Sequence, residues 1–131
     1  MIGRRVVVLR VVTPAAIDGY CALTGDLDPL HVDAAFAATT PYRERIAPGA
    51  LVIGYMMAAA AEATGNLGIP VPSLGFDRLR HTAPVLIGDR LRIEYVIVSV
   101  VDERGHADIT VTNQRDETVA VADHVFRILS P

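Results

Sequence analysis

The sequence contains no lysine, no tryptophan and only one cysteine among its 131 residues. All 12 basic residues are therefore arginine, and with 15 acidic residues the formal net charge is −3. This balance argues against a nucleic-acid partner. The single Cys21 allows neither an intrachain disulfide nor a multi-cysteine zinc site, and we interpret it as a small buried residue rather than a nucleophile. Such cysteine usage is typical of a reducing compartment, so we expect a cytoplasmic protein.

The sequence also lacks an apolar run long enough to cross a bilayer. The longest uncharged stretch, Ile46 to Ala61, contains Pro48 and Gly49 and is shorter than the roughly 20 residues that a membrane-spanning helix needs. The N-terminal valine run is broken by Arg10, so we interpret it as a strand rather than a leader peptide. We therefore expect no membrane span.

What the sequence has in excess is small and aliphatic residues. Aromatic residues make up only 5% of the chain, whereas hydrophobic residues make up 51% and the mean hydropathy is +0.36. A chain of this length fits one domain, residues 1–131, with one core. Because a small monomer has a limited interior, the excess must fill an unusually complete core, or cover a subunit interface and a lipophilic pocket.

The first part of the chain predicts a strand followed by a helix. Valine-rich residues 4–12 are typical of a strand. Thr13 and Pro14 form an N-cap followed by proline at the first helical position, which predicts a helix to about Leu23 that ends at Gly25.

The rest of the chain predicts a central helix and further strands. Asp33 is expected to cap a short helix. No residue from 49 to 61 is charged, so the helix expected there is apolar all round and must be covered on every side. Alternating patterns predict strands at 72–82, 90–101, 106–114 and 118–129, with a hairpin turn at 103–105. This order predicts an α+β fold in which a curved antiparallel sheet wraps around the central helix.

One pair of side chains in the loop after the first helix suggests acid–base chemistry. Asp26 and His31 lie five residues apart across a turn that contains Pro29. A carboxylate and an imidazole brought together in this way can hold a water molecule between them, and the imidazole can move a proton near neutral pH. Taken alone, the pair is more readily explained as a capping aspartate and a histidine bonded to the backbone.

The other histidines do not form a recognisable metal site. His81, His106 and His124 lie in or beside predicted strands, and no third ligand stands near any of them in the sequence. We interpret them as hydrogen-bonded or exposed strand residues, and we expect no bound metal.

The residues around the Asp/His pair resemble a family signature. The pattern is Tyr-x2-Leu-Thr-Gly-Asp-x-Asp-Pro-Leu-His-x5-Ala, from Tyr20 to Ala37, and it resembles the signature of the MaoC-like (R)-specific enoyl-CoA hydratases. The similarity extends through Ile46-Ala47-Pro48-Gly49 and Ala83-Pro84-Val85-x2-Gly88-Asp89. The resemblance implies a hotdog fold with about five strands around a long helix.

The resemblance also implies a reaction and the residues that perform it. Asp26 and His31 would activate water for syn addition to a 2-enoyl thioester of coenzyme A or acyl-carrier protein, giving an (R)-3-hydroxyacyl thioester without a cofactor. The backbone N–H of Gly49 would polarise the thioester carbonyl, because unpaired amides and the helix dipole favour negative charge at a helix N-terminus. Family members pair edge to edge and place their sites at the interface, so a homodimer is expected.

We also consider Tyr55, Met56 and Met57 on the central helix as candidate acyl-pocket residues, although such side chains more often belong to a core. Met57 stands where some relatives have a small polar residue, which suggests a more apolar or differently shaped acyl channel.

Two further departures from the family pattern affect the site. Asp28 replaces the usual Asn; both can form the same turn, but a second carboxylate near Asp26 could raise the proton affinity of the pair. Pro48 replaces a histidine found in many relatives.

Three other functions remain open from the sequence. A hotdog thioesterase would direct the activated water at the thioester carbonyl instead of the alkene. A non-catalytic subunit of a heteromeric dehydratase would depend on a partner for its active site. A lyase of the same type could also add a nucleophile other than water.

Overall fold

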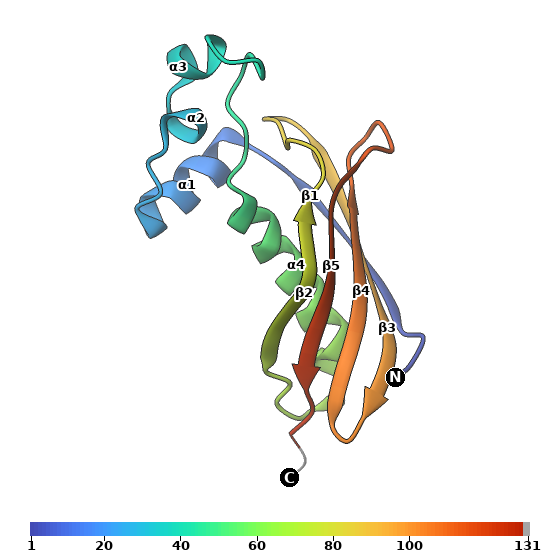
Figure 1. Cartoon of the computed structure of the whole chain (residues 1–131). Coiled ribbons are helices and arrows are strands. Elements are labelled where there is room, and N and C mark those ends of the chain that lie inside the picture. Colours follow the sequence, from blue (N-terminus) through green and yellow to red (C-terminus); the bar gives the residue numbers. More distant parts are fainter. Residues whose placement is uncertain (130–131) are drawn as a thin grey trace.

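The computed structural model describes residues 1–129 of the chain. Its strands are β1 (Arg5–Val11), β2 (Ser73–His81), β3 (Arg90–Val101), β4 (Arg104–Thr112) and β5 (Thr118–Arg127). Its helices are α1 (Pro14–Thr24), α2 (Pro29–Val32), α3 (Ala34–Ala38) and α4 (Gly49–Thr64), and a short 3-10 helix follows at Gly65–Leu67. Helices α1 to α3 gather at one end of the sheet, and α4 runs along one of its faces (Figure 1).

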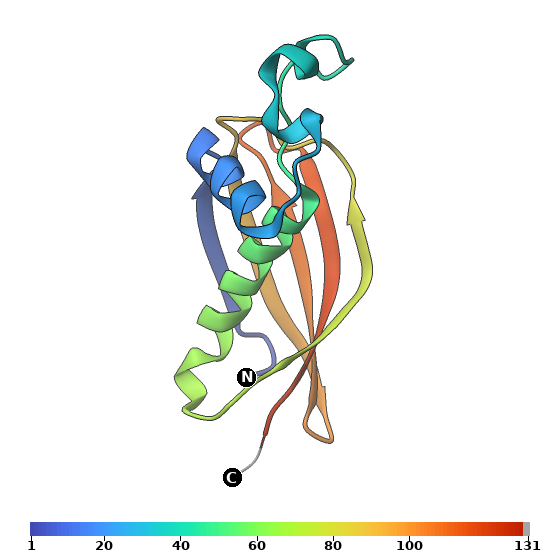
Figure 2. The same ribbon diagram turned by 90° about the vertical axis from the view of Figure 1, so that its left-hand side faces the viewer.

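The strands form one antiparallel sheet in the order β1-β3-β4-β5-β2. Alternating residues of β3 face α4: Leu91 is 1% exposed, and Ile93 and Tyr95 are fully buried. The alternating apolar residues in the sequence predict this one-sided burial, because every second side chain of a strand lies on the same face. The predicted α+β hotdog architecture, a curved five-stranded antiparallel sheet with a long central helix, is confirmed. Figure 2 shows the helix lying in front of the sheet.

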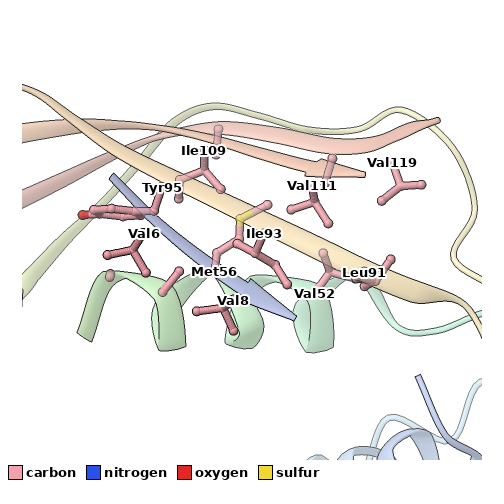
Figure 3. Packing of buried hydrophobic residues seen from close by; sticks show 14 of the residues in the cluster. Val6, Val8, Val52, Met56, Leu91, Ile93, Tyr95, Ile109, Val111 and Val119 are labelled. Atoms are coloured by element: carbon pink, nitrogen blue, oxygen red, sulfur yellow. The ribbon is translucent and has the colours of Figure 1, made fainter. Parts of the chain in front are cut away.

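The prediction that α4 is covered on every side is wrong for the single chain. Val52, Met56, Ala59 and Ala63 form a buried stripe toward the sheet, and Figure 3 shows Val52 and Met56 packed beneath β3. The opposite side of the helix is only half-buried, and Gly54 on that side is exposed. The reason is the two-layer architecture, in which one sheet can cover only one side of a helix.

The hairpin turn between β3 and β4 is shorter than predicted, and β4 begins at Arg104, two residues earlier than expected. Asp102 and Glu103 have φ values of 51° and 65°, which is typical of a two-residue type I′ turn. Gly105 lies inside β4 instead of in the turn. A Cβ at this position would lie 2.2 Å from the Phe126 ring, so only glycine fits without a shift. The glycine therefore allows close packing rather than a turn.

A chain of hydrogen bonds crosses the buried side of the sheet. The His124 ring is 2% exposed. Its Nδ1 lies 2.7 Å from the Tyr95 hydroxyl and its Nε2 lies 2.8 Å from the Ser73 Oγ. Burial lowers the pKa of His124 to about 4 and raises that of Tyr95. Both ring nitrogens are thus satisfied while the imidazole is neutral.

None of the helices among residues 1–129 has the length and apolar character required to cross a membrane.

Candidate active site

The loop that carries the Asp/His pair is shaped by a succession of helix caps. The Thr13 side chain accepts a hydrogen bond from Ala16 N–H, and α1 ends at Gly25 with a φ of 79°, both as predicted. The Asp33 side chain caps α3, also as predicted. Helix α2 was not predicted, because four residues that begin with a proline look like a turn in sequence.

Asp28 caps the helix that carries His31. Its Oδ1 accepts the Leu30 N–H at 2.9 Å, and the His31 N–H donates to the Asp28 carbonyl at 2.8 Å. The Asp26 Oδ1 in turn lies 3.4 Å from the Asp28 N. The aspartate that replaces the usual asparagine therefore performs the capping role that either residue can fill.

His31 is oriented by a backbone carbonyl on a distant segment. Its Nδ1 lies 2.8 Å from the Ile46 carbonyl oxygen, and its Nε2 lies 3.9 Å from the Asp26 Oδ2. Because a carbonyl can only accept, Nδ1 carries the proton and Nε2 of the neutral ring is left as the basic atom. The structure thus brings Asp26 and His31 together, with the basic nitrogen facing the carboxylate.

The segment that holds His31 also leads into α4. Ile46 N–H donates to the Leu30 carbonyl at 3.3 Å, and Ala47 N–H donates to the Val85 carbonyl at 2.7 Å. Two residues later Gly49 begins α4, and Pro48 provides no side-chain cap. No hydrogen bond from the Gly49 N–H to any acceptor occurs within residues 1–129. A free amide therefore stands at the N-terminus of the long helix, where the helix dipole favours negative charge.

His31 and Gly49 line one cavity of about 200 Å³. Most of its other lining is apolar and includes Ala47, Val52 and Val85. His81 also lines it, although no sequence motif indicated that this histidine lies beside His31 and Gly49. A basic imidazole nitrogen and a free backbone N–H thus border an apolar hollow, and the Asp26 carboxylate lies beside the imidazole, which suits proton transfer next to a developing oxyanion.

The three candidate acyl-pocket residues lie outside this cavity. Met56 is fully buried in the core, as Figure 3 shows. Met57 lines a separate cavity of about 100 Å³ together with His124. Tyr55 is half-buried, and burial raises the pKa of its hydroxyl.

Cys21 is buried beneath the Asp26 loop, as the sequence predicted. Burial raises the pKa of its thiol, and the nearby carboxylates of Asp26 and Asp18 raise it further. The side chain is therefore a protonated core residue rather than a thiolate nucleophile.

Among the described residues, no group of three or more histidine, cysteine, aspartate or glutamate side chains is arranged to hold a metal ion. A larger cavity of about 430 Å³ lies between the end of β1 and the start of β3, and none of the candidate site residues lines it.

Comparisons with known proteins show the family to which the chain belongs. The MaoC-like domain family matches residues 3–120. The chain is 27% identical over 132 residues to a 3-hydroxybutyryl-CoA dehydratase of Methylorubrum extorquens, covering 97% of this chain and 80% of that protein. It is 31% identical over 100 residues to an (R)-specific enoyl-CoA hydratase of Aeromonas caviae, covering 73% of this chain and 69% of that protein. The structure of an unliganded R-hydratase from Pseudomonas aeruginosa, 28% identical, has a TM-score of 0.83 and is matched over 100% of this chain and 83% of that chain. The chain therefore belongs to the MaoC-like domain family.

Proposed function

We propose that the protein catalyses the reversible syn hydration of trans-2-enoyl thioesters, of coenzyme A or acyl-carrier protein, to (R)-3-hydroxyacyl thioesters. The observation that carries the proposal is the Asp26–His31 pair beside the cavity at which α4 begins. Family membership and relatives named as a dehydratase and an (R)-specific hydratase support this reaction class.

The pair is spaced to hold the reacting water. A separation of 3.9 Å between His31 Nε2 and Asp26 Oδ2 is too long for a direct hydrogen bond, but one water can bridge it. The water oxygen bonds to C3 of the enoyl thioester and loses a proton to the pair. A proton from the pair then reaches C2 on the same face, which gives syn addition. The step adds one water molecule and is balanced in both directions, so the same groups would catalyse the reverse dehydration.

The N-terminus of α4 supplies the electrophilic side of the site. When water adds to C3, negative charge moves onto the thioester oxygen, and the free Gly49 N–H, which borders the same cavity, would donate a hydrogen bond to it. One such preorganised donor is typically worth about 3 kcal/mol in a transition state.

The direct test is the decrease in enoyl-thioester absorbance when crotonyl-CoA is added to purified protein. We expect Asp26→Asn and His31→Ala each to lower kcat by about 10²-fold or more, because each removes an acid–base group. Asp108→Asn and His106→Ala make similar changes on β4, outside the cavity, and serve as folded controls.

Each rival function predicts a different outcome. Release of free thiol without loss of the alkene would identify a thioesterase. An inactive protein that gains activity only with a second chain would identify a heteromeric subunit. Substrate loss that requires an added amine or other nucleophile would identify a different lyase. Near-normal rates in folded Asp26→Asn and His31→Ala variants would refute the assigned roles.

We also propose that the protein is a homodimer. The flanks of α4 that the sheet covers only in part are apolar and half-buried, and they include Leu51, Ile53 and Tyr55. Strands β1 and β2 are both edge strands. A second subunit would cover these apolar side chains, which accounts for part of the apolar excess. A monomer measured by light scattering at micromolar concentration would contradict this proposal.

A further inference from the structure

His81 is placed directly over the residue that begins α4. A Cβ built on Gly49 would lie 2.6 Å from the His81 Nε2 and 3.1 Å from both neighbouring ring carbons. The nitrogen is thus the nearest atom, and its two neighbours are equally distant, so the ring points its Nε2 corner at Gly49. The residue opposite His81 in β5 is the fully buried Ala120, and directly paired residues face the same side of a sheet. His81 therefore lies on the α4 side of the sheet, at the end of β2, where it remains exposed to solvent.

The distance between the His81 ring and the Gly49 amide is short enough for one atom to bond to both. Covalent bonds near 1.5 Å link the built Cβ to the Gly49 nitrogen through Cα, which places His81 Nε2 within about 5.6 Å of that nitrogen. Two hydrogen bonds of about 2.9 Å that meet at one acceptor can span about 5.8 Å. This separation lets one oxygen atom lie within hydrogen-bond distance of both nitrogens.

The His81 ring has no competing partner. Within residues 1–129 its side chain makes no hydrogen bond and no ion pair. The ring borders the 200 Å³ cavity beside His31 and also an adjoining hollow of about 310 Å³ lined by Tyr42. His31, in contrast, has its Nδ1 bonded to a carbonyl and its Nε2 facing Asp26. The two imidazoles therefore have different environments around one cavity, which suits different roles.

We propose that His81 is a further catalytic residue, whose Nε2–H donates to the thioester carbonyl oxygen beside the Gly49 N–H. The proposal rests on the proposed hydratase function and adds a second donor to the oxyanion site. In this arrangement the Asp26–His31 pair moves the protons, while His81 keeps its own proton and stabilises the charge that develops on the oxygen.

The first experiment separates catalysis from binding. Steady-state hydration of crotonyl-CoA is measured for the wild type, His81→Phe, which keeps a flat ring, and His81→Gln, which keeps an N–H donor. We expect His81→Phe to lower kcat by about 10²-fold with little change in KM, because the donor acts on the developing charge. His81→Gln is expected to lie between the two, and His106→Phe, on β4, should match the wild type.

The second experiment uses a signal that a purely structural role would not change. Crotonyl-CoA labelled at the carbonyl carbon is bound to His31→Ala, which is expected to turn it over slowly, and its carbonyl stretching frequency is recorded. Adding His81→Phe should move that frequency back toward the value in water, because one hydrogen bond to the oxygen is lost. An active wild type with unchanged kcat and carbonyl frequency in the His81→Phe variants would overturn the role of His81 and leave the hydratase function intact. An inactive wild type would overturn both.

Discussion

His124 makes the stability of the protein depend on pH over a defined range. The ring is 2% exposed, and burial lowers its pKa from 6.5 to about 4. The unfolded chain therefore binds a proton on this residue between those pH values while the folded chain does not, and folding loses stability as the pH falls from 6.5 to 4. The full effect below pH 4 is about 3 kcal/mol, because each pKa unit is worth about 1.4 kcal/mol. Between pH 7 and pH 5 the loss is about 2 kcal/mol.

The assay is urea unfolding followed by circular dichroism at pH 7 and pH 5, with the protein concentration held constant. Carboxylates also titrate as the pH falls, so the informative quantity is the difference between the wild type and His124→Gln, whose amide can still bond to Tyr95 and Ser73. We expect the wild type to lose about 2 kcal/mol more than this variant, whereas the control His106→Gln should lose as much as the wild type. Equal losses in the wild type and His124→Gln would refute the reasoning, as would an NMR titration of the folded wild type showing His124 protonated near pH 6.5.

Three smaller predictions concern packing, an ion pair and a helix cap. Gly105→Ala should reduce the free energy of unfolding by about 1–3 kcal/mol, because the new Cβ would lie 2.2 Å from the buried Phe126 ring; a variant with the wild-type unfolding midpoint would show that the ring can move freely. Two arginines hydrogen-bond to Glu94 and lower the pKa of its carboxyl, so Glu94→Gln should reduce stability at pH 7 by about 1 kcal/mol or less. This loss should shrink both in high salt and as the pH falls below 4.5, and a salt-independent loss would contradict the ion-pair explanation. Asp28→Ala should cost about 1 kcal/mol by removing a cap and Asp28→Asn much less, a difference that thermal unfolding of the two variants can measure.

The parts of the fold that sequence predicted well are those fixed by local physics. The strand at 90–101 is predicted with the bounds that the structure shows for β3, because its apolar residues alternate and one face is buried from Leu91 to Ile97. Thr13, Gly25 and Asp33 act as caps as predicted, since each cap requires only hydrogen bonds or backbone angles within its own turn.

The incorrect predictions have a different origin. Gly105 resembled a turn glycine, but its place in β4 is explained by the Phe126 ring on β5, a contact that no short segment of sequence describes. Likewise, the absence of charge in residues 49–61 of α4 predicted that the helix is buried, but it did not indicate which part of the protein or which subunit covers each side. The sheet covers one side of the helix, so the apolar composition of the other side is a property of this chain that a second subunit would explain.

The candidate site likewise has one part that local sequence predicts and one part that depends on tertiary packing. Asp26 and His31 could be predicted because one turn and one short helix bring them together, so their proximity is encoded within six residues of sequence. The electrophilic side of the site combines Gly49 with His81, which are far apart in the chain and meet only because the end of β2 packs over the first turn of α4. A strand histidine carries no local sign that it faces a helix N-terminus rather than solvent. For that reason the proposed proton-moving pair could be suggested from the sequence, whereas the proposed second donor required the packing of the sheet against the helix.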